Sequence, residues 1–561
     1  MKREKIEKFA HVVIATLFTC MIVFLFAVSI FGNSFVNHDE FTYYVTDNAL
    51  IHILSFFVIV GCGLAYRRFR RNGLSDRVKK NLWTCMLIVY SVILAAIALC
   101  VALEPRADQA SIVDTAMAMI KGDYSAFEKG GYMYVYPNQV GIVYFFYWLF
   151  QIFPFGYKTV FVLNAISLAI IVWGMNGIGR IFLKNDKSYG TGIVTLLFFP
   201  MACYVTFVYG NLIGMALSTL GIYYAWKYLE ERKNIQIVLG IIFTALAVII
   251  KENFLIPLIG IAFFLVFDII RKPSKKSILF LVSLLLVTTG ISNGVRIHTE
   301  HIIGQEISEG VPALAWVAMG MQPGYMAYGW HNQYNEDVYR ENDCNTEATN
   351  KVVKKEIADR IHKFISQPVY MVRFFYQKTI SQWNNPSFEG FWINDPLLRQ
   401  SERSDAKKVE KVVECIAGEP GNYWLNLYCN IYQTLILLGT CAWLLLGRKE
   451  IKFNQLLLAT IFVGGFIFHT IWEAKCQYVM PYFVLVFPYA VRGWKLLLDQ
   501  VDGFLKDKEA IRVKCKNHKA VTVMLGICLV ISLLSIAGKK YVDKAVGFNN
   551  YVFEKFLHDR K

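Results

Sequence analysis

A carboxylate that closely follows an apolar segment is the first feature of this sequence that could do chemistry. Asp108 comes a few residues after the apolar run Trp83–Leu103, and Arg106 and Gln109 lie beside it. A carboxylate at the edge of a membrane can act as a general base if its pKa stays near its working range. Guanidinium groups bind phosphate through two parallel hydrogen bonds. We predict that Asp108 is catalytic and that Arg106 and Gln109 bind substrate; an interfacial anchor is the other interpretation of Arg106.

The residues after Asp108 are typical of an amphipathic helix that lies in the membrane interface. Over Ala110–Phe127, apolar side chains recur at helical spacing, while Asp114, Lys121 and Asp123 fall elsewhere on the helix. For Asp114 and Asp123 we expect a solvated polar face rather than chemistry. The loop ends near Pro137, before the next apolar run.

Two further turns carry ionisable residues between apolar runs. Lys251-Glu252-Asn253 follows the run Ile235–Ile250, and Glu473 and Lys475 lie between Ile461–Ile471 and Val479–Phe487. Charged groups in such surroundings are costly unless they are paired or line a wet cavity. Each lysine is a candidate ligand for a lipid phosphate, and pairing with the neighbouring glutamate is the alternative. His469, one helical turn before Glu473, fits a packed polar residue better than a ligand.

Composition and hydropathy predict an all-α polytopic membrane protein. The 561 residues are 55% hydrophobic, with a mean hydropathy of +0.40, and the charges are confined to short stretches between apolar runs. Roughly 13 of these runs approach the length needed to cross the hydrocarbon layer. We divide the chain into a two-helix segment (1–81), a transmembrane core with the external catalytic loop 104–139 (82–295), an external, mainly helical cap (296–426) and C-terminal helices (427–561).

The charge distribution predicts the orientation of the chain. The net charge of +16 arises largely from basic turns such as Arg67–Lys80 and Arg271–Lys276, which fit the cytoplasm, as does the N-terminus. The Asp108 loop and Arg296–Asn426 then face the exterior. Three apolar stretches between Asp108 and Tyr209 disturb this alternation, so the shortest, Val140–Phe153, is a candidate re-entrant element.

Absent motifs narrow the function. The sequence contains no GxxxxGK[ST], HExxH or GxSxG, so nucleotide-driven pumping, zincin proteolysis and a serine-hydrolase elbow lose support. The cysteines show no CxxC spacing, and His38-Asp39-Glu40 matches metal ligands in residue type only. We therefore predict no metal site, although a divalent metal stays compatible with the chemistry. The net positive charge could suggest a nucleic acid partner, but the basic residues cluster where cytoplasmic turns are expected, so we predict none.

Taken together in order, these segments resemble the GT-C glycosyltransferase superfamily, in particular the protein O-mannosyltransferase and aminoarabinose-transferase branch. The resemblance runs from about Trp83 onward. It is carried by Pro105…Asp108-Gln109, Gly122–Ser125, Tyr136–Gln139, Tyr209-Gly210-Asn211, Lys251…Asn253, Lys378…Trp383 and Glu473…Tyr478.

The resemblance implies an enzyme that moves a sugar from a polyprenyl-phosphate donor to a glycan, lipid or protein acceptor on the outer face of the cell membrane. Asp108 would deprotonate the acceptor hydroxyl, and the anomeric centre would invert. The expected substrate-binding residues are Arg106, Gln109, Tyr136, Gln139, Asn211, Lys251, Asn253, Glu473, Lys475 and Tyr478. The sequence departs from the resemblance at Asn211, where relatives often carry an acidic residue, and this weakens the case for a metal. A lipid-linked-sugar flippase and a noncatalytic component of an envelope-polymer assembly are the alternatives.

Overall fold

The structure is a computed structural model that describes residues 2–36, 40–69, 75–101, 103–184, 188–394, 421–447 and 451–506. Their regular secondary structure is helical apart from one two-stranded hairpin and an isolated bridge. Eight of the described helices are long and apolar enough to cross a membrane. The chain is therefore an all-α polytopic membrane protein, as the hydropathy predicts.

Most of the long apolar helices contain about 20 to 30 residues, which at 1.5 Å per residue is enough to span some 30 Å of hydrocarbon. They are α1 (Lys2–Phe31), α2 (Ala49–Phe69), α3 (Asp76–Val101), α7 (Tyr157–Phe182), α12 (Leu255–Arg271), α13 (Lys275–Ile303), α20 (Gly421–Leu446) and α21 (Leu457–Ile471). Together with their adjoining 3-10 turns, η4 (Glu252–Phe254) and η7 (Phe453–Leu456), α12 and α21 reach membrane-spanning length.

Shorter, broken or more polar helices complete the bundle. They are α8 (Gly190–Leu197), α9 (Phe199–Cys203), η3 (Tyr204–Thr206), α10 (Asn211–Glu231), α11 (Asn234–Ile250), α22 (Cys476–Val484) and α23 (Phe487–Lys506). The eight long spans fall short of the roughly 13 apolar runs expected because several runs form these pieces instead. The run Val521–Ile536 lies outside the described residues.

The helices divide into an inner and an outer set. Within the most apolar stretch of α20, 72% of residues are buried, and in α7 the share is 61%, whereas in α2 and α3 it is 17% and 11%. Exposed leucine, valine, isoleucine and phenylalanine side chains cover α2 and α3. Such faces suit lipid contact, so the outer helices shield an inner group that holds the buried polar residues.

The loop after α3 forms a compact layer at one end of the bundle. It contains α4 (Asp108–Ile120), η1 (Ser125–Phe127), α5 (Tyr132–Val135), η2 (Pro137–Gln139) and α6 (Val140–Ile152). The apolar face of α4 is buried through Ile112, Val113, Ala116 and Met119, as its spacing predicts. At 13 residues, α6 is about 20 Å long, too short to cross 30 Å of hydrocarbon.

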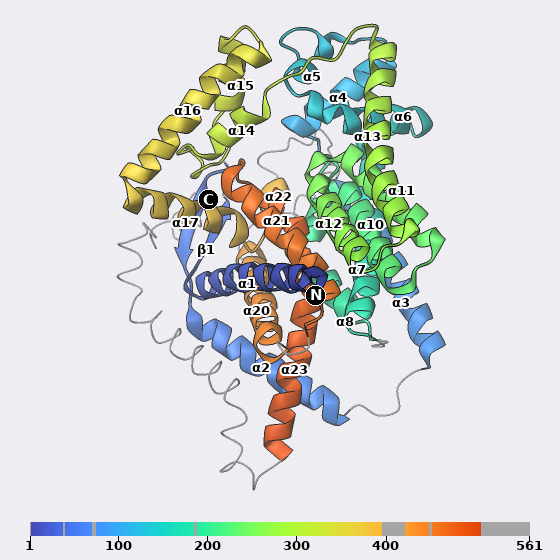
Figure 1. The fold of residues 1–561 in the computed structure, drawn as a ribbon, viewed down its shortest axis with the longest axis vertical. Coiled ribbons are helices and arrows are strands. Elements are labelled where there is room, and N and C mark those ends of the chain that lie inside the picture. The colour runs from blue at the N-terminus through green and yellow to red at the C-terminus, as the bar shows by residue number, and fades with distance from the viewer. Residues whose placement is uncertain are drawn as a thin grey trace.

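The segment after α13 forms a helical cap at the same end of the molecule. Its helices are α14 (Ala313–Gly320), α15 (Tyr334–Glu341), α16 (Thr346–Ser366), α17 (Pro368–Trp383) and α18 (Gly390–Ile393). Figure 1 shows α4 to α6 beside the upper part of α13, with α14 to α16 as a second lobe at that end. The expected helices Ala348–Ile365 and Val369–Trp383 thus appear as α16 and α17.

A hairpin that the sequence did not predict joins the N-terminal helices to this cap. Its strands, β1 (Gly32–Val36) and β2 (Thr42–Thr46), pair antiparallel between α1 and α2. The Ser34 N–H donates to the Asn384 carbonyl at 2.9 Å, and the Thr42 N–H donates to the Met326 carbonyl at 3.1 Å. These bonds fix the connection at Glu40 against the cap.

Candidate functional site

One tyrosine joins the predicted base to a predicted phosphate ligand. The Tyr209 hydroxyl donates to Asp108 Oδ2 at 3.2 Å. The ammonium of Lys251 lies 3.9 Å from the centre of the Tyr209 ring and donates to the Tyr209 carbonyl at 3.4 Å. Asp108 and Lys251 are far apart in the sequence, yet both contact the side chain of Tyr209. A single site that contains both residues requires such proximity.

Asp108 is held at the first turn of α4 by an unusual backbone. The preceding Ala107 has φ 48°, a conformation that non-glycine residues rarely adopt. Such strain recurs at functional sites. Gln139 supports the arrangement because its Nε2 donates to the Tyr209 hydroxyl at 2.8 Å. Gln109 plays a framework role: it is buried, and its Oε1 accepts from the Val208 N–H at 2.8 Å.

Lys251 is partly buried and has no carboxylate in contact among the described residues. Its Nζ donates to Asn211 Oδ1 at 2.7 Å, and among the described residues no acidic group lies within ion-pair distance of it. Burial lowers the pKa of Lys251 to about 7, against the raising effects of Asp108 and Glu473. The expected alternative, a pair with the neighbouring Glu252, is not what the structure shows.

Asn211 and Gln477 complete this half of the site. Asn211 accepts from Lys251 and donates weakly to Gln477 Oε1, at 3.4 Å. The residue is thus committed to orienting the ammonium. Its Oδ1 already accepts from the Lys251 ammonium. The described residues contain no group of three histidine, cysteine or acidic side chains arranged for a metal ion.

Lys475 has the opposite surroundings. Its Nζ forms an ion pair with Glu40, which comes from the connection between β1 and β2. Burial alone would lower the pKa of Lys475, but Glu40, Glu389 and Glu473 together raise it above its ordinary value. The sequence offered Glu473 as an alternative partner to a lipid phosphate; the structure instead brings a carboxylate from the N-terminal hairpin.

Glu389 is a second carboxylate that sequence reasoning missed. It is 1% exposed, its Oε1 accepts weakly from the Cys476 N–H at 3.4 Å, and its Oε2 has no hydrogen-bond partner. Burial raises its pKa to about 7, although Lys475 opposes that change. Phe388 and Glu389 both have positive φ, at 46° and 63°. Positive φ at two consecutive non-glycine residues is rare and is commoner at functional sites, so we add this turn to the candidate site.

Trp392 connects Arg106 to Lys475. The Arg106 guanidinium lies 4.0 Å from the centre of the Trp392 ring and donates to the Trp392 carbonyl at 3.3 Å. Lys475 Nζ lies 5.3 Å from a ring centre of the same indole. Arg106 therefore belongs to the site through a cation–π contact, which also limits its freedom to grip a phosphate bidentately.

Lys378 holds the turn that carries Glu473 and Lys475. It is 1% exposed, and its Nζ donates to the carbonyls of Gly320 and Trp472, the latter at 2.7 Å. Burial lowers the pKa of Lys378 to about 7. Tyr478 donates to Glu473 Oε2 at 3.4 Å, and burial raises the pKa of Glu473.

Two expected substrate-binding residues make other contacts. The Tyr136 hydroxyl donates to Glu336 Oε2 at 2.7 Å, which ties the Asp108 loop to the cap. Asn253 contributes its backbone carbonyl, which accepts from the Tyr482 hydroxyl at 3.0 Å. Asp114 and Asp123 are exposed, as predicted for a solvated face.

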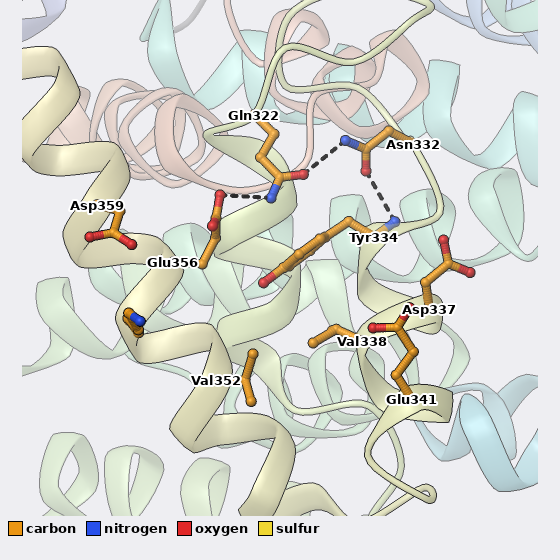
Figure 2. Close-up of a pocket in the computed structure, with 10 residues that line it drawn as sticks. Gln322, Asn332, Tyr334, Asp337, Val338, Glu341, Val352, Glu356 and Asp359 are labelled. Carbon is orange, nitrogen blue, oxygen red and sulfur yellow. Dashed lines mark hydrogen bonds between the residues drawn. The ribbon is translucent and has the colours of Figure 1, made fainter.

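A separate acidic pocket of about 580 Å³ opens in the cap, between α15 and α16. Figure 2 shows Gln322 bridging Asn332 and Glu356, with both bonds 3.0 Å long. Asp337, Glu341 and Asp359 also line this pocket. None of the predicted site residues lines it.

The fold and the site thus describe an integral, multi-pass membrane protein with a buried ionic cluster at one end of its helix bundle. The chain belongs to the family described as conserved hypothetical integral membrane protein, which it matches over residues 6–494. No curated protein matches it.

Proposed function

We propose that this protein is a membrane glycosyltransferase that transfers a sugar from a polyprenyl-phosphate donor to an acceptor hydroxyl. The observation that carries the proposal is the contact of Tyr209 with both Asp108 and Lys251. Transfer needs a base beside the nucleophile and a cation beside the departing phosphate. Tyr209 contacts both the candidate base, Asp108, and the candidate cation, Lys251.

The reaction would run in one displacement. Asp108 accepts the proton of the acceptor hydroxyl as its oxygen bonds to the anomeric carbon. The bond from that carbon to the phosphate oxygen breaks, and its electron pair leaves with the phosphate. Attack opposite the leaving group inverts the anomeric centre.

Lys251 is the stronger candidate for the phosphate ligand. Lys475 is already paired with Glu40 in direct contact. Among the residues that the structure describes, Lys251 contacts only neutral groups, and Asp108 and Glu473 act on its charge without contacting it. A phosphate would supply the anion that a buried ammonium otherwise lacks. We assign Lys475 to holding Trp392 and Glu40 in place, with a weaker effect on the leaving group.

The same proposal places the site on the outer face of the cell membrane and the N-terminus in the cytoplasm. Asn211 starts α10 and Lys251 follows α11, so both lie at the site, while the opposite ends of these helices meet at Arg232 and Lys233. The basic turn at Arg271–Lys275 follows α12 on that same opposite side. Basic turns favour the cytoplasm. If α6 does not cross the membrane, successive turns alternate between the two sides throughout this part of the chain.

An in-vitro transfer assay tests the activity. Detergent-purified full-length protein would be given a panel of polyprenyl-phosphate sugars and extracts containing glycan, lipid or protein acceptors. We expect one donor to be consumed, with an inverted product. Movement of an intact lipid-linked sugar across reconstituted vesicles, without any bond cleavage, would instead favour the flippase alternative.

Cysteine labelling tests the orientation. Ser125→Cys and Lys351→Cys sit on exposed positions of the loop and the cap, and Lys275→Cys sits on the basic turn. In a background without native cysteines, an impermeant maleimide should label the first two in intact cells and the third only after lysis. The reverse pattern would overturn the orientation.

A further inference from the structure

A second pocket, of about 420 Å³, lies at the far end of α10 from the Asp108 site. The helix begins at Asn211, in the site, and its 21 residues cover about 30 Å. Glu230, near its last residue, lines the pocket. The pocket is therefore separated from the proposed transfer site by about the thickness of the hydrocarbon layer.

Side chains from five helices or turns surround this pocket. They come from α1, the end of α7, the end of α10, the end of α12 and the 3-10 turn η7 before α21, and they include Glu7, Lys184, Trp226, Glu230, Arg271, Lys452 and Gln455. Convergence of distant segments on one hollow is typical of a ligand site rather than of a surface irregularity.

The charges of the pocket leave two cations uncommitted. Arg271 binds Glu7 through two nitrogens, so these two charges offset each other. Glu230 accepts weakly from Asn454 Nδ2, at 3.4 Å. Lys184 and Lys452 have no carboxylate within ion-pair distance among the residues that the structure describes. The pocket therefore has a surplus of positive charge.

Trp226 supplies an independent sign of a missing ligand. The residue lines the pocket and is 1% exposed, yet its indole N–H has no hydrogen-bond partner. A buried donor without an acceptor is unfavourable. The N–H is enclosed, so the ring must turn for it to donate to an acceptor oxygen in the pocket; an indole nitrogen can only donate.

We propose that this pocket binds a phosphate group, with Lys184 and Lys452 contributing charge and the Trp226 N–H donating to a phosphate oxygen. An anionic lipid headgroup and a free phosphate share this chemistry. The site goes beyond the proposed transfer reaction and does not depend on it, because no residue of the Asp108 cluster lines the pocket.

Titration calorimetry on the full-length protein in detergent tests the proposal. The probes are dioctanoyl phosphatidic acid, inorganic phosphate and, as a zwitterionic control, dioctanoyl phosphatidylcholine. The double variant Lys184→Gln/Lys452→Gln should weaken binding of the phosphate probe at least about tenfold, since each charged hydrogen bond contributes on the order of 1.5–3 kcal/mol. Trp226→Phe, which keeps a ring but removes the N–H, should weaken it about fivefold.

The matched control is Lys275→Gln/Lys276→Gln, which removes the same charge from exposed lysines that do not line the pocket. Its binding should equal that of the unaltered protein. Binding of phosphatidic acid alone would identify a lipid headgroup, and equal binding of inorganic phosphate would identify a free phosphate. Equal losses in the pocket and control variants, unchanged affinity in Trp226→Phe, or no saturable binding would each overturn the proposal.

Discussion

Lys251 and Lys475 lie in the same buried cluster but in opposite electrostatic surroundings. Lys251 contacts an amide, a carbonyl and an aromatic ring, and burial lowers its pKa to about 7. Lys475 contacts Glu40 and lies near Glu389, and these carboxylates overcome the effect of burial and raise its pKa. The pKa values of two partly buried lysines are thus shifted in opposite directions by the groups that the fold places beside them.

The presence of a contacting carboxylate at Lys475 and its absence at Lys251, among the described residues, indicate different roles for these two halves of the site. A buried cation that is already paired stabilises the structure around it, and removing it leaves unpaired carboxylates. A buried cation with only neutral partners lowers stability and persists where a ligand or a reaction requires it. The Lys251 half is therefore where we expect substrate to bind, and the Lys475 half is where we expect the site to be held together.

The largest effect should come from the base beside Lys251. Asp108→Asn keeps the shape and the contact with Tyr209 but removes the proton acceptor, so transfer should fall by about 10²–10⁴-fold while expression is unchanged. Asp114→Asn, on the exposed side of the same helix, should retain full activity. Transfer rates of the two purified variants decide the point, and near-normal turnover by Asp108→Asn would remove this residue from the mechanism.

Lys475→Gln should mainly cost stability. Breaking a buried ion pair from one side typically costs about 3–5 kcal/mol because the partner charge is left behind. Thermal unfolding in detergent should show a lower Tm, and the double variant Lys475→Gln/Glu40→Gln should recover part of the loss because both charges are then absent. A double variant no more stable than Lys475→Gln would argue against the pair as the source of the effect.

Lys251→Gln should show the reverse pattern. The substitution removes a buried cation with no carboxylate partner, so Tm should stay equal or rise. Donor affinity should fall about tenfold or more, since a hydrogen bond to a charged group contributes on the order of 1.5–3 kcal/mol. Donor Kd and Tm measured on the same samples separate these outcomes; a lower Tm with unchanged Kd would assign Lys251 to the framework.

The pH dependence of donor binding should also distinguish the lysines. Lys251 is protonated below its pKa of about 7 and loses its charge above it, so donor Kd should be constant in mild acid. Above neutral pH the affinity should fall by up to about tenfold per pH unit. The raised pKa of Lys475 keeps that residue charged throughout this range.

Lys251→Gln should flatten this pH profile. Glu389 also titrates near pH 7, so Glu389→Gln serves as the comparison and should leave the alkaline slope in place. If the alkaline slope of donor affinity disappears in Glu389→Gln and survives in Lys251→Gln, the titrating group is Glu389 and not Lys251.

Much of the fold was predictable because it follows from patterns of neighbouring residues. The long helices follow from apolar runs, and α4 and α16 follow from helical spacing. The assignment of the Asp108 loop and the Lys251 and Lys475 turns to one site came from the resemblance. Apolar runs alone locate the ends of each helix but not its neighbours.

The missing parts depend on contacts between distant segments. Glu40 stands in a short acidic motif that gave only a weak signal, and nothing near Glu389 indicates that its carboxylate is buried beside Lys475. Tyr209 and Trp392 bind cations through their rings, a role that aromatic residues in an apolar chain do not reveal. The alternative pairing of Lys475 with its sequence neighbour Glu473 is not what the structure shows, for the same reason.

The contact of Glu40 with Lys475 also has a consequence for biogenesis. The ribosome makes Glu40 early and adds Lys475 only 435 residues later. At about 5–20 residues per second, this interval is on the order of 20–90 s. During that time Glu40 is without its partner Lys475 while later helices are still being inserted. The charge cluster can form only after α21 and α22 have been made. A nascent chain stopped before that point would hold the base but not the completed cluster around it.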